Sequence, residues 1–204
     1  MTIGFPGAHD LRFSSTIASM MNIPHHAKEI DKEEFLSDLQ AVRTITGCPN
    51  VSHIENCIAY REIARLARKI GVGVILSANG CDELFCGYNG YRTACVGGPG
   101  MIMEMMAKKI DNERELVAEI TLSTSEYGIS VRQPFLSANF IEFSKSVPLH
   151  DKIRGSDDML RKHALRKAAL DLGVPAEAAL KPKKALQYGS LVHKHYQKAI
   201  KGGT

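Results

Sequence analysis

The chain has 204 residues, of which 44% are hydrophobic and 24% are charged. This composition is typical of a globular chain that buries one substantial core. No run of about 18 apolar residues occurs, and the first residues show no basic stretch followed by an apolar one, so the sequence predicts neither a membrane span nor a secretory signal. We therefore expect a cytoplasmic protein that makes no membrane contact.

Charge is distributed unevenly along the chain. Residues 151–204 carry 12 Lys or Arg against 5 Asp or Glu, a formal charge of +7, whereas the first 150 residues carry 14 against 17, a charge of −3. A basic segment suits a nucleic acid or a small polyanion, but Tyr188 and Tyr196 are its only aromatic residues, which disfavours base stacking. We expect a small polyanion such as ATP and no nucleic acid.

The five cysteines are odd in number and show no C-x-x-C spacing, which argues against a disulfide framework and against a zinc site. We interpret them as small buried apolar side chains. They are Cys48, Cys57, Cys81, Cys86 and Cys95.

The N-terminal half alternates strand and helix patterns. Residues 2–5 predict the end of a buried strand, followed by a helix over 11–21 that Asp10 caps. A second short strand is expected near residues 26–30, and Asp31 then caps a helix that begins at about Lys32 and ends near Gly47.

The clearest helix begins with a capping-box pattern at Ser52–Glu55, keeps a helical stripe of apolar residues from Ile54 to Ile70 and ends at Gly71. Directly after it, residues 72–77 form a short β-branched apolar run, as expected of a parallel strand buried on both faces. A long helix that feeds such a strand predicts an α/β fold with a doubly wound parallel sheet.

The second half is predicted to be mostly helical. Helices are expected over 101–110, over 112–123 with Asp111 as cap, over 138–146 and over 157–172, and the Gly97–Gly100 stretch is a candidate hinge. We expect one domain over residues 1–204, with a sheet half over 1–96 and a helical half over 97–204.

Ligands of open parallel sheets bind beyond the carboxyl ends of the strands, so the loop from Ser77 to Tyr88 is the first candidate site. Its small residues let backbone N–H groups approach an anion, and Asp82 and Glu83 are suited to hold Mg²⁺ against phosphate oxygens. The alternative is an ordinary strand-to-helix turn, with Asp82 favoured by the helix dipole.

Two basic clusters are further candidates. Lys162 and Arg166 lie four residues apart, and on a helix they would share one face and could clamp phosphates. The lysine-rich segment from Lys181 to Ser190, which includes Lys183, could close over bound phosphates. From the residues alone, a solvated charged surface is the more common explanation of either cluster. The His25–His26 and His193–His195 spacings do not suit metal ligands on one helix face, so we assign no metal role to the histidines.

Five ordered segments together resemble the synthetase domain of asparagine synthases and of β-lactam synthetase. The resemblance covers nearly the whole chain, and the residues of the last segment are similar to those of archaeal members. The segments are Gly4–Leu11 for Gly-Leu-Pro-Gly-x-x-Asp-Leu with His25-His26 following it, Ile75–Tyr88 for the central Ser-Gly-Glu-Gly-x-Asp-Glu motif, Arg132–Ser137 for Arg-x-Pro-Phe-Leu-Asp, Lys162–Arg166 for Lys-x-x-Leu-Arg, and Lys181–Ser190 for the closing lysine-rich segment.

The resemblance implies an adenine nucleotide alpha hydrolase-like fold and an ATP-dependent ligase of asparagine biosynthesis. Such an enzyme activates the aspartate side-chain carboxylate as an acyl-AMP, releases pyrophosphate and forms the amide with ammonia. ATP and Mg²⁺ are the implied cofactors. The implied catalytic residues are Lys162, Asn79 and Arg166; the implied nucleotide contacts are Ile3, Gly4, Ser77, Ala78, Gly80, Asp82 and Lys183, with Asp82 as metal ligand; Arg132 and Glu83 are implied to bind the amino-acid substrate.

The sequence departs from the family pattern at several carboxylates. The family's Gly-Glu pair is Ala78-Asn79 here, and two further acidic positions are Ser130 and Ser137. The family's Ser-Gly-Gly-x-Asp-Ser loop, which wraps pyrophosphate, would lie a strand and a helix before Thr2. We therefore expect catalysis to need a further segment or a partner chain.

Candidate partners are an upstream synthetase half, a separate glutaminase and a second copy of this chain. Two other functions remain open: a related ATP pyrophosphatase with another acceptor, and a nucleotide-binding or interaction module without turnover.

Overall fold

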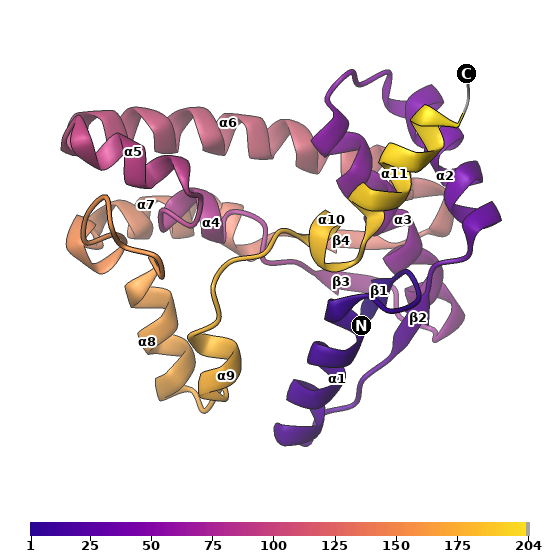
Figure 1. Ribbon diagram of the computed structural model, residues 1–204, viewed down its shortest axis with the longest axis horizontal. Coiled ribbons are helices and arrows are strands. Elements are labelled where there is room, and N and C mark those ends of the chain that lie inside the picture. Colours follow the sequence, from indigo (N-terminus) through magenta and orange to yellow (C-terminus); the bar gives the residue numbers. More distant parts are fainter. Residues whose placement is uncertain (203–204) are drawn as a thin grey trace. The chain divides into compact units, whose positions relative to one another are not determined.

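The computed structural model describes residues 1–202 and shows a mixed α/β protein that is mostly helical, with two small pairs of strands (Figure 1). The chain forms two compact units. Unit 1 comprises residues 1–75, 116–131 and the segment from Lys184 onward, and unit 2 comprises residues 76–115 and 132–183. Whether all 204 residues form the single predicted domain stays a prediction. Within residues 1–202, no helix has both the length and the apolar character that a membrane crossing needs.

Unit 1 contains the first strand pair and the helices around it. Its elements are β1 (Thr2–Gly4), α1 (His9–Met20), β2 (Ala27–Glu29), α2 (Lys32–Thr46), α3 (Val51–Lys69), the C-terminal part of α6 (Pro99–Thr124), η1 (Ser125–Tyr127), α10 (Leu186–Gly189) and α11 (Val192–Lys201). The predicted strand over 26–30 is confirmed, as is the helix that begins at Lys32, whose Asp31 side chain accepts from the N–H groups of Glu33 and Glu34.

The two strand pairs are both parallel. In the first, β1 pairs with β2 and Ile3 lies opposite Lys28. In the second, β3 (Val74–Leu76) pairs with β4 (Ser130–Arg132), and the division between the units runs through this pair. The N–H of Ser130 donates to the carbonyl of Gly73 at 3.0 Å and the N–H of Ser77 to that of Arg132 at 2.9 Å, so both strands advance in the same direction. The described strands do not by themselves form the predicted doubly wound sheet.

Several predicted helix boundaries are wrong, and the reason differs from helix to helix. Helix α3 begins at Val51, since Asn50 accepts from the N–H groups of Ser52 and His53, and Ser52 lies inside the helix. Helix α1 begins at His9, one residue before its predicted cap Asp10. Asp111 lies within the single helix α6, which begins at Pro99, so the predicted hinge is reduced to a connection of two glycines.

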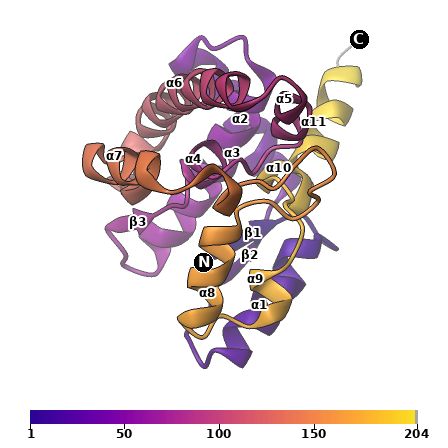
Figure 2. The same ribbon diagram turned by 90° about the vertical axis from the view of Figure 1, so that its left-hand side faces the viewer.

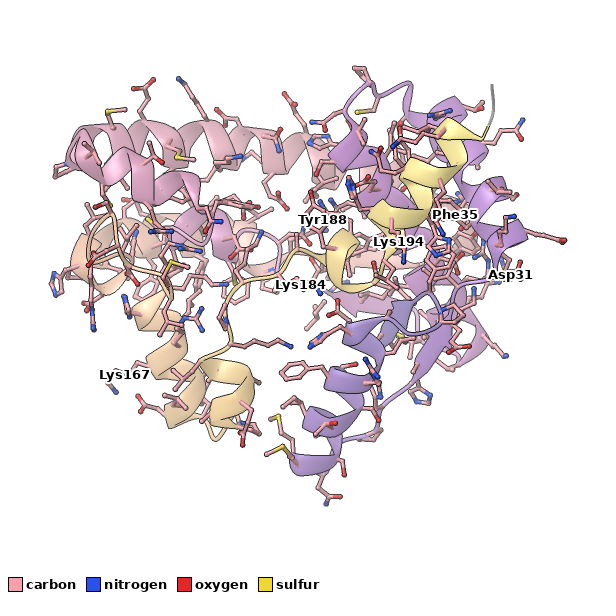
Figure 3. All side chains as sticks on the ribbon, in the orientation of Figure 1. Asp31, Phe35, Lys167, Lys184, Tyr188 and Lys194 are labelled. Atoms are coloured by element: carbon pink, nitrogen blue, oxygen red, sulfur yellow. The ribbon has the colours of Figure 1, made fainter. Side chains whose placement is uncertain are left out.

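The core of unit 1 is formed by α2, α3, α6 and α11 around β1. Phe5 packs edge-on against Phe35 with ring centroids 5.3 Å apart, and it stacks on the His195 ring with centroids 3.5 Å apart. Phe35 is labelled on α2 in Figure 3. Ile58 of α3 and Ile120 of α6 are also fully buried. This packing buries the apolar stripe of α3 that the sequence predicts.

Unit 2 consists of short helices and turns around the N-terminal part of α6. Its elements are α4 (Cys81–Leu84), α5 (Gly90–Val96), η2 (Pro134–Leu136), α7 (Ala138–Ser146), η3 (Leu149–Asp151), α8 (His163–Asp171) and α9 (Ala176–Ala179). Helices α8 and α9 lie side by side (Figure 2). The predicted helix over 138–146 is confirmed, with Ser137 as its cap.

The core of unit 2 is small. Tyr91 of α5 is fully buried against Cys86, Ile102, Met106 and Ile153. No disulfide joins the five cysteines within residues 1–202. Cys57 and Cys86 are buried, whereas the other three are half-buried, so the prediction that every cysteine is buried is wrong.

Candidate functional site

The loop that follows β3 turns sharply into the four-residue helix α4. Gly80 precedes this helix with φ of 99°, and a Cβ atom there would lie 2.8 Å from Cδ2 of Leu136, so only glycine fits. The backbone bond from Ser77 to Arg132 holds the start of the loop against β4. The sequence prediction that Ser77, Ala78, Gly80 and Asp82 belong to one turn after a strand is therefore confirmed as a statement about the backbone.

Asp82 is the centre of a cluster of charges in unit 2. Its Oδ1 atom lies 2.8 Å from Nζ of Lys162 and its Oδ2 atom 3.5 Å from Nζ of Lys183. The three side chains are only 18–23% exposed, so solvent screens the interaction partly. A Cβ atom at Gly87 would lie 1.9 Å from Oδ1 of Asp82, so the missing side chain at position 87 makes room for this carboxylate. Two predicted phosphate-binding lysines, distant in sequence, thus contact the predicted metal ligand.

The predicted helix over 157–172 begins six residues late, at His163. Asp158 is the reason, because its carboxylate accepts from the N–H groups of Arg154, Leu160 and Arg161 and folds the preceding segment into a turn. Burial alone would raise the pKa of Asp158, but these bonds and His163 outweigh it and lower the pKa to about 2. Lys162 precedes the helix in a left-handed conformation with φ of 55°. Hence the prediction that Lys162 and Arg166 share one helix face is wrong.

Arg166 is 7% exposed and faces the protein backbone. Its guanidinium donates to the carbonyl oxygens of Leu160, Arg161, Ala179 and Lys181, at 2.6–3.0 Å. These bonds tie the turn before α8 to the end of α9. A role for Arg166 in catalysis stays a prediction, and its described contacts hold the segment that carries Lys162.

A second group of polar side chains lies beside Asp82. The amide of Asn79 donates to a carboxylate oxygen of Glu113 on α6, and the Tyr88 hydroxyl donates to Glu83. Glu83 and Glu113 are 2% and 5% exposed. Burial, together with the neighbouring Glu83 carboxylate, raises the pKa of Glu113 to about 7. Burial and the same carboxylate also raise the pKa of Tyr88.

Sequence reasoning missed Glu113 and Tyr88 as members of this group. The Tyr88 ring has Nζ of Lys183 at 4.1 Å and Nζ of Lys109 at 4.9 Å from its centroid. Tyr88 is the last residue of the central motif, so the motif could have indicated that Tyr88 lies near Asp82. Glu113 is 34 residues from Asn79 on a helix, and no local pattern connects the two.

The other predicted site residues are placed as follows. Ile3 and Gly4 lie in β1 of unit 1, where the Ile3 side chain is 1% exposed. Arg132 ends β4 and is exposed. Their predicted contacts with nucleotide and substrate stay predictions.

The donor set of the Asp82 cluster fits a magnesium-bound polyphosphate. Carboxylate oxygens are the ligands that Mg²⁺ prefers, and ammonium groups pair with phosphate oxygens. Both lysines pair with Asp82 in the structure, and both ammonium groups stand on flexible stems that keep about a fifth of the side chain exposed, so they can exchange the carboxylate for a phosphate oxygen. The two ammonium groups can therefore stabilise the negative charge of a bound anion, which is an electrostatic effect.

The chain belongs to the asparagine synthase family, whose pattern matches residues 1–121 and 103–201. It is 25% identical over 187 residues to asparagine synthetase B (glutamine-hydrolyzing) of Escherichia coli, a match that covers 92% of this chain and 33% of the relative. It is 26% identical to asparagine synthetase (glutamine-hydrolyzing) 1 of Saccharomyces cerevisiae over 90% of this chain and 32% of that protein.

A third relative is asparagine synthetase domain-containing protein 1 of Mus musculus, 32% identical over 62% of this chain and 21% of its own length. The chain thus spans about a third or less of the curated relatives it matches. The resemblance seen in the sequence is confirmed at the level of the family.

Proposed function

We propose that this chain supplies the nucleotide-activating part of an ATP-dependent amide ligase. The ligase would activate the aspartate side-chain carboxylate as an acyl-AMP, release pyrophosphate and form the amide with ammonia. The observation that carries the proposal is the contact of Asp82 with both Lys162 and Lys183, which come from two separate segments. Membership of the asparagine synthase family supports it.

The proposed roles follow from charge. Asp82 holds Mg²⁺, which neutralises phosphate oxygens when bound. Lys162 and Lys183 release Asp82 and donate to the phosphates, and the positive charge of Lys162 offsets the charge that grows on the departing pyrophosphate. The backbone of Ser77, Ala78 and Gly80 contacts the nucleotide, as do Ile3 and Gly4.

The acceptor substrate is the second part of the proposal. Arg132 is exposed at the end of β4, and its planar guanidinium suits bidentate binding of the substrate α-carboxylate. Glu83 is engaged by Tyr88, so a substrate contact at Glu83 requires that hydroxyl to move. Asn79 cannot act as a base, and Asn79, Ser130 and Ser137 together favour a second candidate, a related ligase that activates a different acceptor.

Exposed apolar residues on β3 support a larger sheet. Leu76 is 70% exposed and Val74 is 44% exposed, although parallel strands are normally buried on both faces. We propose that the two strand pairs belong to one doubly wound parallel sheet that further chain completes, either from an upstream synthetase half or from a second copy. Ammonia would come from solution or from a separate glutaminase chain.

Calorimetric titration with Mg·ATP tests the nucleotide site. We expect Lys162→Ala to weaken binding by about 10- to 100-fold, because a hydrogen bond to a charged group contributes about 1.5–3 kcal/mol. The matched control is Lys167→Ala, because Lys167 lies on the same segment, is 76% exposed and points away from α8 toward solvent (Figure 3). No binding by the wild-type chain, or equal affinities for wild type and Lys162→Ala, would overturn the proposal.

Pyrophosphate release separates the candidate functions. Release that depends on aspartate and ammonium supports the asparagine synthase reaction, whereas release with another amino acid or a nucleic acid supports a different acceptor. Tight Mg·ATP binding without release for any acceptor indicates a nucleotide-binding module.

A further inference from the structure

Three side chains with metal-binding atoms meet in unit 1, apart from the Asp82 cluster. Cys48 lies in the connection between α2 and α3, His53 in the first turns of α3, and Glu119 on α6. One ligand atom from each lies within 4.8 Å of the other two. Thiol sulfur, imidazole nitrogen and carboxylate oxygen are the three ligand types that zinc combines in proteins.

One ring nitrogen of His53 has a hydrogen-bond partner and the other has none among the described residues. It is 3% exposed, and its Nδ1 atom lies 3.0 Å from Oε2 of Glu119. Its Nε2 atom is buried without a hydrogen-bond partner among the described residues. A buried polar atom without a partner costs about 1–3 kcal/mol, and a metal ion bound through Nε2 would remove that cost.

The backbone around Cys48 holds its sulfur in one place. The N–H of Asn50 points at the Sγ atom of Cys48 at 3.3 Å, and the same Sγ atom lies 4.0 Å from the carbonyl oxygen of Asn50. Thr46 accepts from the N–H of Cys48 at 3.2 Å, which fixes the turn that carries the sulfur. Cys48 is half-buried, so an ion can reach the group from solvent.

Cys57 lies one helical turn after His53 but differs from Cys48 in its surroundings. It is fully buried in the core of unit 1, whereas Cys48 is half-buried. Cys57 is therefore closed off from solvent and is not one of the three residues that meet in the group.

We propose that Cys48, His53 and Glu119 bind one zinc ion, with water as the fourth ligand. Three protein ligands and one open position are a common zinc arrangement, with metal–ligand distances of about 2.0–2.3 Å. The three ligand atoms already lie within 4.8 Å of one another, so small side-chain movements would bring them to such distances from one ion. The ion would join the start of α3 to α6 and would hold the connection that carries Cys48.

Cobalt substitution in the full chain tests this site. After removal of metals by a chelator, titration with Co²⁺ should give a thiolate-to-cobalt charge-transfer band that saturates at one equivalent. Cys48→Ser should abolish the band, whereas Cys95→Ser, which removes a half-buried cysteine of unit 2, should leave it unchanged. Glu119→Gln should keep the band because the sulfur ligand remains, with weaker affinity.

Zinc affinity supplies a second readout that needs neither ATP nor turnover. Cys48→Ser should weaken zinc binding by more than about 100-fold, since even residues that merely support metal ligands contribute about 10- to 100-fold. Zinc should raise the Tm of the wild type and of Cys95→Ser but not that of Cys48→Ser. The proposal is wrong if no charge-transfer band forms, or if Cys48→Ser and Cys95→Ser bind zinc equally well.

Discussion

Each unit contains one aspartate that contacts two cationic side chains, and the two arrangements differ in geometry. In unit 1, Asp38 is 1% exposed, and it accepts from Nε of Arg61 at 2.8 Å and from Nη2 of Arg65 at 2.9 and 3.0 Å. In unit 2, Asp82 is 23% exposed, and its partners are the single ammonium groups of Lys162 and Lys183.

The difference separates a structural ion cluster from an exchangeable one. Arginine presents a rigid fork of donors that fits a carboxylate in one geometry, whereas the lysine ammonium is a compact charge on a flexible stem. Arg61 also donates to the carbonyl of Ser123 and Arg65 to the hydroxyl of Tyr127, so the Asp38 cluster holds α2, α3 and the end of α6 together. Asp82 can lose its partners to a ligand at much lower cost.

Removal of Asp38 gives the largest expected effect. Asp38→Ala leaves Arg61, which is 4% exposed, without its carboxylate, and breaking a buried pair in this way costs about 3–5 kcal/mol. Urea denaturation should show this loss in the free energy of unfolding, or a chain that does not fold. Asp82→Ala is the matched control and should cost about 1 kcal/mol or less. Equal losses would contradict the distinction between the two clusters.

The second prediction concerns pH and the carboxyl beside the Asp82 cluster. Because the pKa of Glu113 is raised from 4.5 to about 7, the folded protein binds this proton more tightly than the unfolded chain does. The group therefore favours folding most below about pH 4.5 and progressively less as the pH rises toward 7. Over that range the contribution to the free energy of unfolding falls by about 3 kcal/mol at most.

Glu113→Gln tests this effect because glutamine keeps the acceptor for Asn79 and does not ionise. Near about pH 8 the variant should be more stable than the wild type by about 1–3 kcal/mol, and the difference should shrink near about pH 5. Urea denaturation at both pH values provides the measurement. An equal difference at the two pH values would show that the ionisation of Glu113 is not its cause.

The smallest effect is expected for Lys183. Its Nζ atom is 3.5 Å from Asp82, which is too long for a strong hydrogen bond, so Lys183→Ala should change the free energy of unfolding by about 0–1 kcal/mol. A loss comparable with that of Asp38→Ala would show that the lysine has a structural role. In that case the Asp82 cluster could not exchange its partners freely.

Local patterns predicted many elements of the fold but not their ends. The Asp31 cap, the stripe of α3 and helix α7 followed from side-chain type and period alone. The cap at Ser52 was wrong because Asn50, two residues earlier, is the better acceptor in the folded chain. The helix predicted from Asp157 failed because Asp158 bonds to nearby backbone N–H groups, which competes with helix formation.

The candidate site was predictable in its parts but not in its contacts. The central motif pointed to Asp82, and the basic clusters pointed to Lys162 and Lys183, yet the sequence did not show that these three side chains touch. Glu113 was missed because its burial and its bond to Asn79 arise only from packing. The cysteine and histidine spacing likewise hid the group around Cys48, since His53 and Glu119 are 66 residues apart.

The backbone at Lys162 bears on how this protein would respond to selection. Arg161 and Lys162 are two consecutive residues with positive φ, of 50° and 55°, and each such residue costs roughly 1–2 kcal/mol unless it is glycine or asparagine. A library screened for thermal resistance alone should therefore enrich glycine at position 162. The enriched variants would have less backbone strain but would lack the ammonium group beside Asp82. A single substitution would then raise thermal stability and weaken ligand binding.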